Sequence, residues 1–96
     1  MIVEYIRYRI EESKADDFEA AYTEAAGPLA ASQHCVGYEL ARCVEDQASY
    51  ILRIEWDSLE GHLEGFRPSP EFRAFLAKIQ PYVSDIEEMQ HYRTTE

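Results

Sequence analysis

The sequence predicts an α+β domain in which two helices cover one face of an antiparallel sheet. Four segments alternate apolar and polar residues with a period of two, which is typical of strands whose two faces meet different surroundings. Two further segments repeat apolar residues every three or four positions, which is typical of amphipathic helices. The segments follow one another in the order strand, helix, strand, strand, helix, strand.

The first strand and the first helix occupy the N-terminal third of the chain. Residues 1–10 alternate between two faces, and Glu4 interrupts the more apolar face. Residues 15–31 are rich in Ala and Glu, carry an apolar stripe and predict a helix. We expect Gly27 and Pro28 to kink or end this helix, because proline lacks an N–H donor and clashes with the carbonyl four residues earlier.

Two more strands follow as a predicted hairpin. Residues 35–44 and 48–56 both alternate, and the polar residues 45–47 between them suit a short turn. The strand at 48–56 has the clearest alternation in the chain and ends at Trp56. An antiparallel pair of strands is therefore expected here.

A helix in two parts comes next. Asp57 and Ser58 can accept hydrogen bonds from the first free N–H groups of a helix. The apolar stripe expected on this helix comprises Leu59, His62, Leu63 and Phe66. Pro68 interrupts the pattern, and the run Ser69-Pro70-Glu71 predicts a new helix start with a serine cap and a proline in the first turn. Pro81 ends the second part, and residues 84–93 predict a last strand.

This order is that of a ferredoxin-like split βαβ sandwich, with both helices on one face of an antiparallel sheet. The other sheet face then needs cover. One candidate face mixes apolar and charged side chains, which suits pairing with a second copy of the chain. The residues of that face are Val3, Tyr5, Ile51 and Met89 together with Arg7, Arg9, Arg53, Glu39 and Glu55. We therefore expect a homodimer formed through the sheet face.

Composition limits the classes of partner. The chain has 96 residues, of which 46% are hydrophobic, and this fits a single domain over residues 1–96. Nine basic against 19 acidic residues give a net charge of −10, which repels phosphate backbones and anionic lipids, so neither nucleic acid nor membrane is expected as a partner. The N-terminus lacks the pattern of a signal peptide, and Cys35 and Cys43 lie too far apart along one strand to form a disulfide, so we expect reduced thiols and a cytoplasmic protein.

The segments 34–40, 50–58 and 69–72 together resemble the antibiotic biosynthesis monooxygenase family, whose members form dimeric α+β barrels. The resemblance covers nearly the whole chain. It implies a monooxygenase that oxidises a small phenolic or quinol-type aromatic compound without a cofactor. The haem-degrading branch of the superfamily relies on an asparagine, a residue this chain lacks, so we expect no haem. A non-catalytic domain that binds a small molecule or dimerises is the alternative. Isomerisation or decarboxylation without oxygen is a third possible function.

The candidate catalytic residue is His62. On the apolar stripe of its helix, desolvation would keep the imidazole neutral and able to accept a proton from a phenol or quinol. Many family members carry a histidine three residues before the Ser-Pro pair, where this chain has Phe66, and His62 lies one turn earlier. The alternative is a histidine that only packs against the sheet. His34 and His91 are weaker candidates, since they fall in a loop and in the last strand.

Four aromatic residues are candidates for binding the substrate: Tyr22, Tyr38, Trp56 and Phe66. Aromatic rings between helices and sheet suit a pocket for an aromatic ligand, but they equally suit the core of a small domain. Phe72 and Phe75 fit the core better. The side chains that could bind a metal are Glu87, Glu88 and His91, or the pair His34 and Cys35, but neither spacing matches a known ligand pattern, so no metal is expected.

Overall fold

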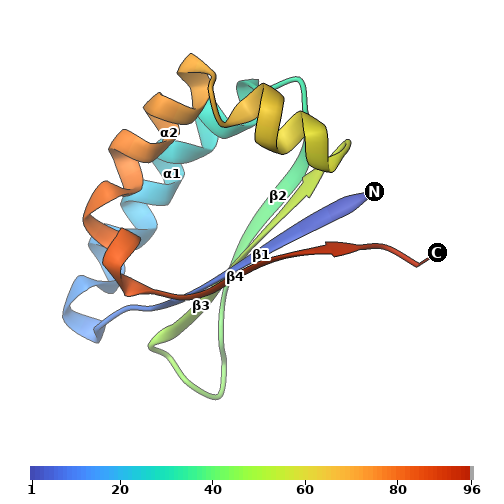
Figure 1. Cartoon of the computed structure of the whole chain (residues 1–96). Coiled ribbons are helices and arrows are strands. Elements are labelled where there is room, and N and C mark those ends of the chain that lie inside the picture. The colour runs from blue at the N-terminus through green and yellow to red at the C-terminus, as the bar shows by residue number, and fades with distance from the viewer. Residues whose placement is uncertain (96) are drawn as a thin grey trace.

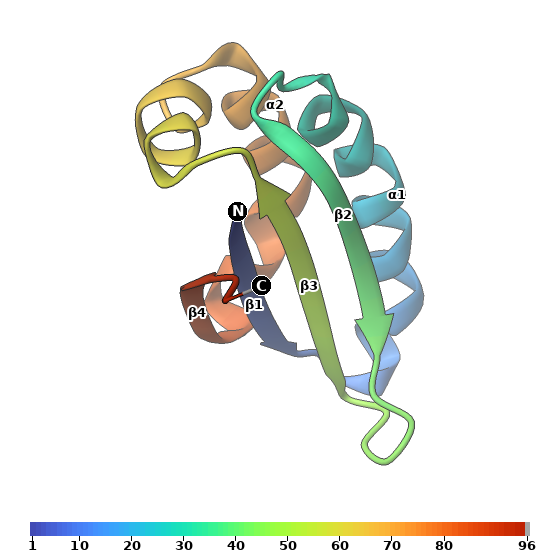
Figure 2. The same ribbon diagram turned by 90° about the vertical axis from the view of Figure 1, so that its right-hand side faces the viewer.

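The computed structural model describes residues 1–95. Four strands form one antiparallel sheet in the order β2-β3-β1-β4, with two long helices on a single face (Figures 1 and 2). The elements are β1 (Ile2–Arg9), α1 (Ala15–Ala31), β2 (Cys35–Arg42), β3 (Ser49–Trp56), a π-helical turn (Gly61–Phe66), α2 (Pro70–Ile79) and β4 (Ile86–Arg93). Short 3-10 helices precede α1 (Glu12–Lys14) and β4 (Gln80–Asp85). The predicted ferredoxin-like fold is confirmed, and so is the β2–β3 hairpin.

The core lies between the sheet and the helices. Ile6 of the central strand β1 pairs with Leu52 of β3 on one side and with Met89 of β4 on the other. The even-numbered residues of β1 and β3 point towards the helices, as the alternation predicted, and pack against Phe18 of α1 and Phe75 of α2. Glu4 is the one charged residue of β1 on this buried face, and it is only 2% exposed.

Helix α1 runs through the proline that was expected to disturb it. It continues past Pro28 to Ala31, so the proline does not end the helix. Ala25 and Leu29, on either side of Pro28, are almost fully buried in the core. Their packing against the sheet holds the last turn in place, because tertiary contacts outweigh the intrinsic preference of a single residue.

The stripe predicted after Ser58 is only partly correct. His62 and Phe66 are buried, but Leu59 and Leu63 are 38% and 44% exposed. The backbone N–H of Arg67 donates to the carbonyl of His62, five residues earlier, which makes this turn a π-helix. A wider turn changes which side chains share a face, so a pattern with a period of 3.6 residues places the leucines wrongly.

Met89 also lies on the other face from the one predicted. The pairing of β1 with β4 shifts register between Arg7 and Tyr8, so that Arg7 lies opposite Glu88 and Tyr8 lies opposite Ile86. This irregularity brings Ile86 and Met89, three residues apart, to the face that the helices cover. A bulge adds one residue to a strand and therefore breaks simple alternation.

The uncovered sheet face carries the remaining residues of the predicted interface. Val3 is buried there, and Ile51 is 37% exposed near the centre. Two arginines of this face already pair within the chain, since Arg53 contacts Glu55 at 2.6 Å and Arg7 contacts Glu87 at 2.8 Å. Both cysteines are free thiols. Within residues 1–95, no helix has the length and apolar character needed to cross a membrane.

Candidate functional site

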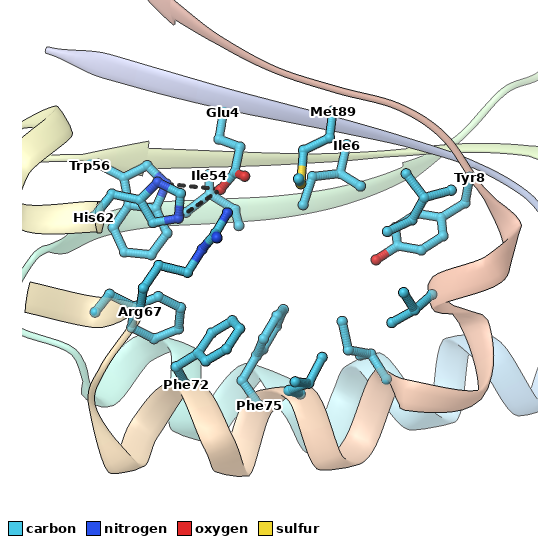
Figure 3. A pocket seen from close by; sticks show the side chains of 15 residues that line it. Glu4, Ile6, Tyr8, Ile54, Trp56, His62, Arg67, Phe72, Phe75 and Met89 are labelled. Atoms are coloured by element: carbon cyan, nitrogen blue, oxygen red, sulfur yellow. Dashed lines mark hydrogen bonds and ion pairs between the residues drawn. The ribbon is translucent and has the colours of Figure 1, made fainter. Parts of the chain in front are cut away.

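A cavity of about 190 Å³ lies between the sheet and α2. Its walls are mostly aliphatic and aromatic, with Phe72 and Phe75 along the helical side. Polar groups gather at one end, where Glu4, Trp56 and His62 lie together and Arg67 extends beside them, while Tyr8 lies at the other end (Figure 3). A mostly apolar cavity with a few polar groups that converge at one end is the usual form of a small-molecule site.

The turn after β3 places His62 in this cavity. The hydroxyl of Ser58 accepts a hydrogen bond from the N–H of Gly61 at 2.8 Å, which confirms the predicted cap. His34 holds the same corner, because its ring nitrogen Nδ1 lies 3.0 Å from the Asp57 carboxylate. A Cβ atom at Gly61 would collide with the side chain of Asp57. Glycine therefore lets the π turn lie close to this corner and turn His62 inwards.

His62 belongs to a cluster of four side chains drawn from four parts of the chain. Its ring stacks on the indole of Trp56, with centroids 4.3 Å apart and an angle of 15° between the planes. Trp56 donates its Nε1–H to Glu4 Oε1 at 3.1 Å. Nε2 of His62 lies 3.5 Å from the same oxygen, and His62 Nδ1 lies 2.9 Å from His91 Nε2. His91 Nε2 is also 3.6 Å from the second Glu4 oxygen.

Burial changes the proton affinity of both central groups. It lowers the pKa of His62 from 6.5 to about 3, helped by the positive charge of Arg67. Desolvation raises the pKa of Glu4 above 4.5, against the opposing effects of His91, the Trp56 N–H and Arg67. The usual order of a carboxyl and an imidazole is thus reversed, so Glu4 holds a proton more tightly than His62. The cluster can accept a proton at His62 and retain it on Glu4.

The structure brings together three of the five residues predicted for the site. Trp56, His62 and Phe66 line the cavity, with the Phe66 ring 4.9 Å from that of Trp56. Tyr22 and Tyr38 instead line a second hollow between α1 and the strands β2 and β3. The hydroxyl of Tyr22 is hydrogen-bonded to that of Tyr8 at 2.5 Å, and Tyr38 is 42% exposed.

Four other polar residues of the cavity region are absent from the predicted set: Glu4, Tyr8, Arg67 and His91. The sequence contains a signal for the first, since Glu4 interrupts an apolar strand face and a charged residue in such a place is rarely buried without a purpose. Tyr8 reads as core, and burial raises its pKa to about 12. His91 was named only as a weaker catalytic candidate and a possible metal ligand, and no pattern in the sequence sets apart Arg67.

Comparison with known proteins gives a family and a curated relative. The family model described as antibiotic biosynthesis monooxygenase matches residues 1–78. The uncharacterised protein YczJ of Bacillus subtilis is 29% identical over 93 residues, which cover 97% of this chain and 98% of YczJ.

Solved structures share the fold at low identity. A candidate antibiotic biosynthesis monooxygenase from Bordetella bronchiseptica superposes with a TM-score of 0.80 at 22% identity, over 99% of this chain and 97% of that one. A mutant of SnoaB, a cofactor-independent oxygenase from Streptomyces nogalater, superposes with a TM-score of 0.79 at 17% identity, over 99% and 93% of the two chains. At these identities the likeness concerns the fold.

Proposed function

This chain belongs to the antibiotic biosynthesis monooxygenase family, and we propose that it oxidises a small phenolic or quinol-type aromatic compound with molecular oxygen and no cofactor. The observation that carries the proposal is the polar cluster of Glu4, His62 and Trp56 at one end of an apolar cavity. The cofactor-independent oxygenase SnoaB shares the fold. The cavity supplies a dry site, and the cluster supplies the proton acceptor.

The reaction needs little else from the protein. Loss of the phenolic proton to His62 leaves an electron-rich anion, which reduces oxygen directly. One oxygen atom forms the new carbonyl of a quinone, the other leaves as water, and the substrate provides the two hydrogens of that water. Arg67 lies beside the cluster and provides positive charge near the anion. Aromatic rings such as Phe72 offer faces on which the substrate ring can pack.

A domain that binds a small molecule without reaction is the second candidate. One observation favours it: the polar atoms of Trp56, Glu4, His62 and His91 contact one another, so the cluster is already satisfied without a substrate. Buried polar networks of this kind also occur for structural reasons. Tyr22 and Tyr38 do not support substrate binding at the same cavity, because they line the other hollow.

An oxygen electrode separates the two candidates. With a panel of small phenols and quinols, a monooxygenase consumes oxygen in proportion to enzyme concentration, and the quinone product appears with one oxygen molecule consumed per substrate. A binding domain gives no uptake above the rate of autoxidation, although it can still bind members of the panel. Loss of substrate under strictly anaerobic conditions would instead indicate isomerisation or decarboxylation.

We propose further that the protein is a homodimer through the uncovered sheet face, with Ile51 near its centre. Ile51→Glu should give a monomer at micromolar concentration in sedimentation velocity, because a carboxylate would be buried without a partner in the interface. Val44→Glu is the matched control, since Val44 is 80% exposed at the hairpin and lies outside the face. A well-folded wild-type monomer, or an Ile51→Glu variant that sediments as a dimer, would contradict the proposal.

We also propose that the protein is cytoplasmic and that neither nucleic acid nor membrane is a partner. Two free thiols support a reducing compartment such as the cytoplasm. A net charge of −10 disfavours nucleic acid and anionic membranes as partners.

A further inference from the structure

We propose that Glu4, His62 and His91 form a binding site for one divalent first-row transition-metal ion at the end of the cavity. Each of the three offers one ligand atom, and these atoms all lie within 4.8 Å of one another. Two imidazoles and one carboxylate are the donor set of many zinc sites and of the facial triad that holds iron(II). The proposal rests on this geometry and is independent of the proposed oxidation.

The spacing of the donor atoms fits a single ion. Ligands about 2.1 Å from a metal in tetrahedral or octahedral arrangement lie about 3.0–3.4 Å from one another. Here His91 Nε2 is 2.9 Å from His62 Nδ1 and 3.6 Å from Glu4 Oε2. Two of the three spacings are therefore close to those around a single ion, and the third lies within 4.8 Å, so the donors must draw closer together to share one.

Neighbouring groups hold two of the three ligands in orientation. The indole N–H of Trp56 is bonded to Glu4 Oε1, which leaves Oε2 turned to His91. The same indole stacks on the His62 ring and fixes its plane. Contacts of this kind around metal ligands raise affinity, because the ligands lose less freedom when the ion binds.

The site combines burial with access. The side chains of Glu4 and His62 are each only 3% exposed, and this burial strengthens the attraction between a bound cation and the carboxylate. The His91 side chain is 26% exposed, so an ion can reach the site from solvent beside this ring. Glu4 and His62 also line the cavity, so the remaining coordination positions of the ion would face it.

The alternative is a hydrogen-bonded cluster that never holds an ion. The His62–His91 contact at 2.9 Å is satisfied if one ring donates a proton to the other, and this proton must leave when a metal binds. A bound ion would occupy a nitrogen or oxygen that the oxidation uses as proton acceptor. Metal should therefore inhibit the proposed reaction, but binding itself can be measured without any substrate.

The test uses the single tryptophan of the chain as a reporter. Chelator-treated full-length protein is titrated with Co²⁺, whose unpaired electrons quench an indole in contact with the site. We expect saturable quenching of Trp56 with one ion per chain, visible absorption bands of coordinated Co²⁺, and reversal by Zn²⁺, which does not quench. Thermal unfolding should shift upwards with metal concentration, since an ion that binds only the folded state stabilises it.

Variants assign the ligands. Glu4→Gln and His91→Gln should each lose at least about tenfold in Co²⁺ affinity, because each removes a ligand atom. Glu64→Gln is the control, since Glu64 is exposed on the π turn and its substitution should leave the affinity unchanged. Circular dichroism verifies that each variant is folded. The proposal fails if the wild-type protein shows no saturable quenching, or if Glu64→Gln weakens binding while His91→Gln does not. Oxygen uptake by metal-free protein tests the oxidation separately.

Discussion

His62→Ala should lower turnover per folded molecule by about 10²–10⁴-fold, the usual contribution of a proton acceptor. His62 is 2% exposed and lies within the polar end of the cavity, and it joins Glu4 to His91. Burial keeps its pKa near 3, so the neutral ring persists across the neutral pH range, and activity should fall only as the pH drops towards that value. Oxygen uptake and sedimentation on one preparation measure turnover and oligomeric state together.

The control separates catalysis from packing. His62 stacks on Trp56, so its truncation also costs stability, on the order of 1–3 kcal/mol. His62→Phe keeps an aromatic ring against the indole but cannot accept a proton. Both variants should be inactive, but only the alanine variant should unfold at a clearly lower thermal midpoint. A stable and active His62→Phe protein would show that His62 is not the proton acceptor.

The fold was predictable because it depends on local periodicity. A strand places alternate side chains on opposite faces, so the alternation of apolar residues in β1 and β3 is enough to identify the buried face. The same rule failed at Met89, where a bulge adds a residue to the strand. The corresponding rule for helices, a period of 3.6 residues, failed at Leu63, because the π turn changes the period of the helix. Neither irregularity has a sequence signal of its own.

The candidate site was predictable only in part because its members come from distant segments. Trp56, His62 and Phe66 belong to one strand-turn-helix corner, and so their proximity follows from the local pattern. Glu4 and His91 meet them through the pairing of β1 with β4, where the two residues lie directly opposite each other. That register depends on the bulge. Tyr22 lies on the buried face of its helix, but the position of α1 over β2 and β3 assigns it to the other hollow.

Glu4→Gln should remove one pH dependence of stability. Desolvation raises the pKa of Glu4 in the folded protein above its unfolded value of 4.5. The wild-type carboxyl is therefore neutral in both states below pH 4.5, and the protein loses stability as the pH rises through the raised pKa, because folding then buries an anion. Glutamine keeps an acceptor for the Trp56 N–H and stays neutral. The variant should equal the wild type in acid and become more stable above the raised pKa.

Urea unfolding of metal-free protein across this pH range measures the difference, with a slope of at most about 1.4 kcal/mol per pH unit for one proton. Glu64→Gln is the matched control, since Glu64 is exposed on the π turn and its substitution removes the same charge from the surface. Activity should move the other way: Glu4→Gln loses at least about 100-fold in oxygen uptake, because a proton accepted by His62 has no carboxylate to receive it. A variant that is more stable at neutral pH yet nearly inactive would show that Glu4 takes part in the reaction although its charge lowers the stability of the protein. If it is instead equally active, Glu4 does not take part in the oxidation and contacts Trp56 and His91 without a role in the reaction.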